Sequence, residues 1–296
     1  MMNQDRPNLI AAIGAPAWRD GLERAQDSEV GFTLSFAEVS PIHRAFAPMV
    51  REQEFDISEL AIVTALQAIA YGKPLIVLPV TMAARFQQGC LIARRDDMPV
   101  TVAALRGRRI GVRAYTQTTG VWLRGILQND YGVPPDTIRW LTQERAHLAE
   151  YIDPPWVEQA PPQASLPDLL RNGHIDAAIL GNDLPDDPDF APVIADPPAA
   201  ARAWYANHGV VPINHVLVVR KDVAIAHPPA IRDLWSTIQR AKPRQSGAYD
   251  MTPIGVEALR RPLEMILNYC EQQLLLPRKL DVDGMFADAV ALLGTR

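Results

Sequence analysis

The hydrophobic positions of this chain switch repeatedly between the spacing of strands and the spacing of helices. Three segments of the first third have the short apolar or alternating runs of buried strands: residues 9–13, 32–36 and 75–80. Apolar side chains recur at helical spacing in residues 41–54 and 55–70, and we interpret Asp56-Ile57-Ser58-Glu59-Leu60 as the opening of the second helix. This alternation predicts a largely parallel sheet with helices on both of its faces.

The same alternation continues in the middle of the chain, between two strands of similar character. Residues 89–94 and 215–220 are both apolar runs that end in basic residues followed by Asp, and further α/β elements lie between them. This arrangement predicts a two-lobed α/β fold in which one lobe, residues 94–215, is inserted into another, residues 1–93 plus 216–296. Two crossover strands would form the hinge, and ligands of such folds bind in the cleft, near strand carboxyl ends and helix N-termini.

Composition limits the class of protein but adds little to this picture. The chain has 296 residues, 48% hydrophobic and 21% charged residues, and a formal net charge of −5. These values are typical of a globular protein and do not favour a nucleic-acid or membrane partner. Only two cysteines occur, and no run approaches the roughly 20 apolar residues of a membrane helix. Because no signal peptide precedes the first strand, we expect a cytoplasmic protein.

The stretch from Arg108 to Gly125 carries the clearest chemical signal. It begins as an alternating strand that ends at Arg113, and helical spacing follows from Gln117 onward. Between them lies a hydroxyl-rich connection that includes Tyr115 and residues 116–119. A helix start leaves backbone N–H groups unpaired and has a positive dipole end, and a guanidinium fits a carboxylate. We therefore expect Arg113, Thr116, Thr118 and Thr119 to bind a small anion, although threonines at such positions are also ordinary helix caps.

Four segments of the chain resemble the 4,5-dihydroxyphthalate decarboxylase family, which uses a fold similar to that of type II periplasmic binding proteins. They are Asp56–Leu60, Gly111–Trp122, His147–Trp156 with its Asp153-Pro154-Pro155-Trp156 end, and Gly209–His215. The resemblance extends over most of the chain, and residues 113–122 and 211–215 are its more specific parts. It implies a two-lobed fold and the non-oxidative decarboxylation of an aromatic dicarboxylate to a dihydroxybenzoate and CO2.

This chemistry needs a base for the phenol, an acid for the ring carbon and cations for the carboxylate that stays. Histidine titrates nearest neutrality, so His147 and His215 are the best acid–base candidates, and Glu59 is a candidate acceptor of a phenol proton. Each also has a structural interpretation, such as helix capping for Glu59. The remaining candidates would bind substrate: Arg85 at a carboxylate, Tyr115 on the ring, and Ser58 and Asn214 as members of the quoted motifs.

No redox cofactor is expected for this reaction, and a metal is only weakly indicated. Glu144, His147 and Glu150 would share one face if their segment were helical, but a second histidine at ligand spacing is missing. The expected partner is a small aromatic carboxylate, and a homo-oligomer is left open. The competing interpretation is a solute-binding protein that delivers an aromatic carboxylate to a transporter or sensor. A related enzyme acting on a different ring acid is a third.

Overall fold

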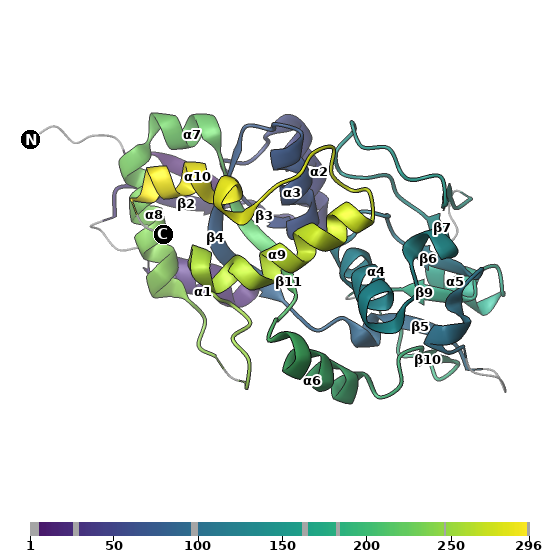
Figure 1. Ribbon diagram of the computed structural model, residues 1–296. Coiled ribbons are helices and arrows are strands. Elements are labelled where there is room, and N and C mark those ends of the chain that lie inside the picture. Colours follow the sequence, from purple (N-terminus) through teal and green to yellow (C-terminus); the bar gives the residue numbers. More distant parts are fainter. Residues whose placement is uncertain are drawn as a thin grey trace, which may run out of the picture. The chain divides into compact units, whose positions relative to one another are not determined.

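The computed structural model describes residues 6–25, 30–95, 100–161, 165–181, 184–245 and 247–294. The chain divides into two compact units (Figure 1). Residues 1–84, 213–264 and 277–296 form the first unit, and residues 85–212 and 265–276 form the second. The predicted lobe boundaries, after residues 93 and 215, lie close to the first two crossings and stay a prediction. The later crossings, after Glu264 and Leu276, had no signal in the sequence.

The first unit is built on a mixed five-stranded sheet with the order β2-β1-β3-β11-β4. Its strands are β1 (Asn8–Ala12), β2 (Thr33–Phe36), β3 (Ile57–Ala61), β4 (Leu75–Ala84) and β11 (Ile213–Arg220). Strand β1 pairs in parallel with β2 and β3, whereas β11 runs antiparallel to both β3 and β4. Because Ile213 pairs with Ala84, the two crossover strands meet where the chain passes between units.

Residues 57–61 are a strand, and the predicted helix start at this position is wrong. All five residues of β3 are buried, and the helix that follows, α3 (Ile62–Ala70), begins only at Ile62. The Asp56 carboxylate accepts a hydrogen bond from Ile10 N at 2.8 Å rather than capping a helix. The spacing of apolar residues in a short run does not distinguish a buried strand from a buried helix. Here the segment is a strand because it pairs with strands on both sides in the centre of the sheet.

The other helices of the first unit pack around this sheet. They are α1 (Pro16–Ala25), α2 (Phe46–Glu52), α7 (Lys221–Ala226), α8 (Pro228–Ala241), the first half of α9 (Val256–Gln272) and α10 (Val282–Leu293), with a 3-10 turn at Ile42–Ala45. Helices α1 and α8 approach closely at Gly21, where a Cβ would lie 2.5 Å from Ala241 O. The core between helices and sheet includes Trp18, Phe32, Leu217 and Ile231, all almost fully buried.

The second unit contains a six-stranded sheet with the order β10-β5-β9-β6-β7-β8. The strands are β5 (Leu91–Arg94), β6 (Arg109–Val112), β7 (Arg139–Thr142), β8 (Val157–Gln159), β9 (Ala177–Ile179) and β10 (Phe190–Pro192). Helices α4 (Thr118–Tyr131), α5 (Leu166–Arg171) and α6 (Pro197–His208) and short 3-10 turns at Gln88–Cys90, Val102–Leu105 and Pro135–Thr137 complete the unit. Strands β9, β6, β7 and β8 are parallel, so their carboxyl ends share one edge of the sheet.

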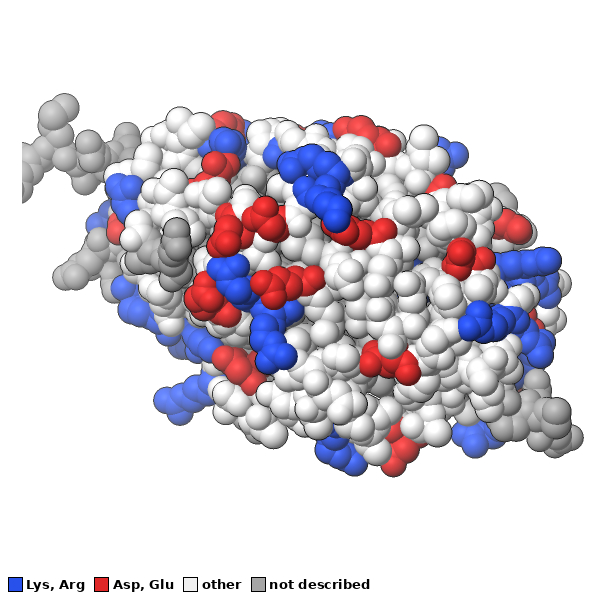
Figure 2. Space-filling view, in the orientation of Figure 1, with Lys and Arg blue, Asp and Glu red and all other residues white. Residues whose placement is uncertain are grey.

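Two surface properties follow from the described residues. Over those ranges, none of the helices combines the length and the apolar character that a bilayer crossing demands. Acidic and basic side chains are interspersed on the face shown in Figure 2, with white surface between them. The charge of the chain is therefore distributed on this face rather than gathered in one patch of a single sign.

Candidate functional site

The first unit holds two of the predicted acid–base residues in direct contact. Glu59 on β3 and His215 on β11 are carried by neighbouring antiparallel strands, and Glu59 Oε1 lies 2.6 Å from His215 Nδ1. The Glu59 side chain is 2% exposed, whereas that of His215 is 21% exposed. We call these two residues the Glu59–His215 pair. The strands thus place a partly exposed imidazole on a buried carboxylate.

The second oxygen of Glu59 is held by the start of helix α1. Glu59 Oε2 accepts hydrogen bonds from Gly14 N at 2.9 Å and from Ala15 N at 3.0 Å. A side chain at residue 14 would collide with Ile42, whose Cβ would lie 2.4 Å from the added Cβ, so a glycine allows this close approach. The positive end of the helix dipole also favours a carboxylate here. Burial alone would raise the pKa of Glu59, but His215 and the two N–H groups more than offset it and lower the pKa.

An ionised Glu59 fixes the roles of the two imidazole nitrogens. A carboxylate only accepts hydrogen bonds, so Nδ1 of His215 carries the proton that it donates to Glu59. Nε2 has no hydrogen-bond partner in the described part of the chain, and the Phe46 ring meets the imidazole edge-on at 5.2 Å between centroids. Glu59, with both oxygens occupied and almost no exposure, does not fit the predicted direct acceptance of a phenol proton. Among the described residues, the partly exposed side chain that Glu59 contacts is that of His215.

The other two substrate-binding candidates of this unit are buried beside the pair. Ser58 is fully buried in β3, and its hydroxyl donates to the Glu59 carbonyl at 2.7 Å. Asn214 in β11 is 7% exposed. Both therefore flank the Glu59–His215 pair along the strands, and neither presents an open side chain to a ligand in this structure.

In the second unit, the carboxyl edge of the sheet carries the predicted anion-binding residues. Arg113 follows directly after β6, and the loop after β7 is tied to it, because Gln143 N and Glu144 N both donate to Arg113 O. The Arg113 side chain is 21% exposed, and Glu144 Oε2 lies 3.7 Å from its Nε. Among the described residues that buried Nε has no hydrogen-bond partner. Arg113 is therefore a guanidinium with donors left for a ligand.

The first turn of α4 lies on the same edge and gathers further polar groups. Helix α4 begins at Thr118 after Gln117, and the N–H groups of Thr119 and Gly120 have no hydrogen-bond partner within the described ranges. Arg85 Nη2 donates to Thr119 Oγ1 at 2.7 Å. A Cβ on Gly181, beyond the end of β9, would lie 3.3 Å from Arg85 Nη2 and 3.4 Å from Gln117 Nε2. We call this group of residues, Gln117–Gly120 with Arg85 and Gly181, the α4 turn.

Two of the predicted residues before this turn are parts of the core. Thr116 is 4% exposed and Tyr115 is 1% exposed. The Tyr115 hydroxyl accepts a hydrogen bond from Trp156 Nε1 at 3.0 Å, and burial raises the pKa of Tyr115. This position does not fit the predicted stacking of Tyr115 on a substrate ring. The same hydrogen bond gives Trp156, the last residue of the Asp153-Pro154-Pro155-Trp156 segment, a structural role.

Arg124 is the polar residue of this region that sequence reasoning missed. It is completely buried on α4, and its guanidinium stacks on Tyr115 and Trp140, with Cζ 4.0 Å and 4.9 Å from the ring centroids. Gln273 Oε1 accepts from its Nε at 2.7 Å, and Tyr115 O accepts from its Nη2. An Arg-Gly pair within a helix ordinarily indicates surface, and only the apolar residues on both sides of it hinted at burial.

His147 lies in the loop after β7, which is bonded to the Arg113 carbonyl through Gln143 and Glu144, and not on a helix. Residues 143–150, after β7, form bends and a turn, His147 is half-buried, and Glu144 and Glu150 are exposed. The helical face that would have aligned these three residues is therefore absent, and this basis for a metal site is wrong. Over the described part of the chain, no group of three or more His, Cys, Asp or Glu residues is arranged to hold a metal ion.

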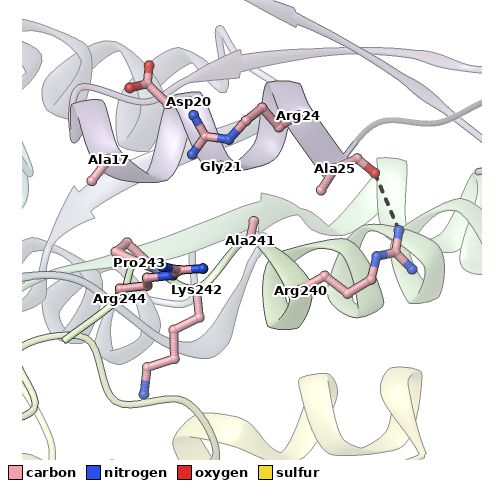
Figure 3. Close-up of a pocket in the computed structure, with 10 residues that line it drawn as sticks. All are labelled: Ala17, Asp20, Gly21, Arg24, Ala25, Arg240, Ala241, Lys242, Pro243 and Arg244. Atoms are coloured by element: carbon pink, nitrogen blue, oxygen red, sulfur yellow. Dashed lines mark hydrogen bonds between the residues drawn. The ribbon is translucent and has the colours of Figure 1, made fainter.

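A separate cavity of about 640 Å³ lies in the first unit, between α1 and the end of α8 (Figure 3). None of the predicted site residues lines it, and its basic residues are Arg24, Arg240, Lys242 and Arg244. Arg24 and Arg240 belong to the last turns of their helices, where cations offset the negative dipole end, and Arg240 donates to Ala25 O at 3.4 Å. Lys242 is paired with Asp250 at 2.7 Å. These contacts account for most of the positive charge around the cavity without a ligand.

Comparison with known proteins relates the chain to decarboxylases. It is 31% identical over 197 residues to a 4,5-dihydroxyphthalate decarboxylase of Comamonas testosteroni, a match that covers 60% of this chain and 58% of the relative. It is 29% identical over 168 residues to a 4,5-dihydroxyphthalate decarboxylase of Pseudomonas putida, covering 52% of this chain and 65% of that protein. No family model matches the chain. The predicted resemblance to this family is confirmed, and the chain spans about three fifths of the length of these curated relatives.

Comparison with solved structures identifies the fold. A putative periplasmic sulfonate-binding protein of Methylobacillus flagellatus superposes with a TM-score of 0.53 over 98% of this chain and 96% of its own, at 11% sequence identity. This likeness confirms the predicted α/β fold similar to that of periplasmic binding proteins. At this low identity it gives the architecture alone, and the chemistry has to come from the site.

Proposed function

We propose that this protein is a carboxy-lyase that removes CO2 from an aromatic dicarboxylate without oxidation, most directly from 4,5-dihydroxyphthalate to give 3,4-dihydroxybenzoate. The observation that carries the proposal is the partly exposed His215 held on the buried carboxylate of Glu59. A protein that only binds a ligand has no need of an oriented proton donor. The similarity to two proteins named 4,5-dihydroxyphthalate decarboxylase supports the substrate class.

The reaction requires one proton transfer to carbon. Ionisation of the hydroxyl para to the leaving carboxylate pushes electrons onto the ring carbon that bears this carboxylate. That carbon takes a proton, the bond to the carboxylate breaks, and its electron pair returns to the ring as CO2 departs. The net change consumes one proton and releases one CO2. Chemistry of this type uses acid–base and electrostatic groups.

The Glu59–His215 pair fits the proton-transfer step. Glu59 orients the ring through Nδ1 and stabilises the imidazolium, which leaves Nε2 as the nitrogen that gives the proton to carbon. The arrangement supports His215 as the catalytic acid and Glu59 as a positioning residue. His147, which lies on the second unit beside the Arg113 loop, is the second candidate and fits the role of base for the phenol.

Arg113 and the α4 turn fit the carboxylate that stays on the ring. Arg113 offers a guanidinium whose Nε has no hydrogen-bond partner among the described residues, and the N–H groups of Thr119 and Gly120, which also lack one there, add dipolar attraction for an anion. Arg85 already donates to Thr119, so it supports this turn and adds positive charge to it. We propose that these groups set the affinity for substrate, whereas His215 sets the rate of proton transfer.

The test is turnover of 4,5-dihydroxyphthalate and of unsubstituted phthalate by the purified protein, with and without a chelator. Product and CO2 are measured together, since decarboxylation releases them in equal amounts. We expect turnover of the dihydroxy compound only, because phthalate has no hydroxyl to supply electrons to the ring. We also expect activity to survive chelation, since the residues proposed to act need no metal. Phthalate serves as the matched control for binding without chemistry.

The alternative function is capture of an aromatic carboxylate for a transporter or sensor. The fold likeness to a putative periplasmic sulfonate-binding protein is the observation that favours it. The two functions differ in turnover and in cellular place, since the enzyme is predicted to be cytoplasmic. Binding of both phthalates without any product would favour the binding protein, as would recovery of the protein outside the cytoplasm on fractionation.

A further inference from the structure

Arg124 is a completely buried cation, and no carboxylate of the described part of the chain lies within ion-pair distance of it. Among the described residues it makes no ion pair, and its hydrogen-bond acceptors, Gln273 Oε1 and Tyr115 O, are both neutral. Asp153 acts on it only from beyond ion-pair distance, and burial lowers the pKa of Arg124. Holding an unpaired charge away from water costs folding free energy, so a protein that keeps one is expected to gain from the electric field of that charge.

The free end of this guanidinium points at the α4 turn. Arg124 lies one helical turn after Gly120, and helical side chains lean toward the helix N-terminus. A Cβ on Gly120 would lie 2.9 Å from Arg124 Nη1, the nitrogen that has no hydrogen-bond partner in the described part of the chain. Gly120 is also one of the two residues of this turn whose N–H groups have no hydrogen-bond partner in the described ranges. The buried cation thus lies beside Gly120, in the first turn of α4.

We propose that Arg124 is a positioning residue whose buried charge raises the affinity of the α4 turn for the carboxylate of an aromatic ligand. This proposal rests on the proposed function for the identity of the ligand. Arg124 reaches the anion through the field that it adds to the N–H groups of Thr119 and Gly120, without touching it. Because the surroundings are dry, this field is weakly screened and salt affects it less than it affects an exposed arginine.

Three variants separate the charge of Arg124 from its packing. Arg124→Met removes the charge and keeps an unbranched side chain, and Arg124→Lys keeps the charge without the planar fork. Gln273→Glu keeps a side chain of the same size and places a carboxylate on Arg124 Nε. In this variant Val121 O also loses its 2.9 Å hydrogen bond from Gln273 Nε2. Thermal unfolding of each variant measures the structural cost separately.

The probes are phthalate and inorganic sulfate, titrated by calorimetry, with the amide resonance of Gly120 followed by NMR to locate binding. We expect a loss of about 10-fold or more in affinity for both anions in Arg124→Met and Gln273→Glu, and a loss of under about 3-fold in Arg124→Lys, since a tenfold change is about 1.4 kcal/mol. A shift of the Gly120 resonance on titration is expected in the unaltered protein.

The proposal is overturned if affinity in the three variants follows the unfolding temperature instead of the net charge of residues 124 and 273 together. It is also overturned if neither anion moves the Gly120 resonance in the unaltered protein. Failure of the proposed function is a separate result, because sulfate and phthalate report on anion binding whether or not 4,5-dihydroxyphthalate is turned over. If the affinities of the variants for these anions fall in the predicted order but the protein releases no CO2, the inference about Arg124 stands and the proposed decarboxylase function does not.

Discussion

Glu59 Oε1 and His215 Nδ1 lie 2.6 Å apart although 156 positions separate them in the chain. The contact exists because β11 returns from the second unit and inserts between β3 and β4 of the first sheet. The other Glu59 oxygen is fixed by two N–H groups at the start of α1. A carboxylate held in this way cannot turn aside, so the imidazole it orients is fixed as well.

Replacing His215 by Asn is expected to lower kcat by about 10²–10⁴-fold, the usual contribution of a general acid, with little change in KM. The matched control is His227→Asn, since His227 is exposed and outside the pair. His147→Asn serves as a comparison, and we expect a smaller loss of kcat from it. Steady-state kinetics on the three variants test this, and an equal loss in His215→Asn and His227→Asn would contradict the assignment.

Replacing Glu59 by Gln is expected to lower kcat and to reduce stability by about 1–3 kcal/mol, because a buried hydrogen-bond partner changes. The folded-state pKa of Glu59 is lowered. Its carboxylate therefore adds stability that is complete above the usual pKa of about 4.3 and is lost as the pH falls through the lowered value. Urea unfolding between pH 7 and pH 3 should show a flatter acid dependence in Glu59→Gln. An unchanged slope would count against an ionised Glu59.

Replacing Arg113 by Gln is expected to raise KM by about 10-fold or more, since a charge-assisted contact to the substrate carboxylate is lost. Arg113→Lys should recover part of this affinity. Arg139→Gln is the control, because Arg139 is exposed at the opposite end of neighbouring strand β7. If KM in Arg113→Gln equals that of the control, Arg113 does not bind substrate.

Replacing Gly125 by Ala is expected to destabilise the protein by about 1–3 kcal/mol through overpacking. A Cβ at this position would lie 1.9 Å from Tyr269 Cδ2, in the contact between α4 and the second half of α9. Gly247→Ala is the control, because a Cβ there meets nothing within 4 Å. Urea unfolding measures both, and equal stabilities would show that the ring of Tyr269 moves aside without cost.

The sequence predicts the fold class and the anion-binding edge because both depend on local patterns. Arg113 and the start of α4 follow from a strand and a helix joined by five residues, 113–117, and β11 follows from its run of apolar positions. The prediction of a helix start at residues 57–60 failed because a fully buried strand and a buried helix have the same apolar composition. Short edge strands such as Phe190–Pro192 carried too few residues for any period.

The contacts between distant residues lay beyond sequence reasoning. Glu59 and His215 were both candidates, yet nothing local shows that they touch or that Glu59 is closed off from a ligand. Tyr115 was expected to stack on the substrate because it is aromatic, and the fold instead places Arg124 on the Tyr115 ring. Arg124 itself could not be recognised, since burial of a charged residue depends on the packing of α4 against the sheet and α9.

The measurement that tests the account most directly is turnover of 4,5-dihydroxyphthalate in D2O with mass and NMR analysis of the product. Protonation of the ring carbon predicts 3,4-dihydroxybenzoate that carries one deuterium at the carbon that lost CO2, with the rate falling sharply in His215→Asn. Tight binding of the substrate with no product would contradict the account and place this chain among the binding proteins.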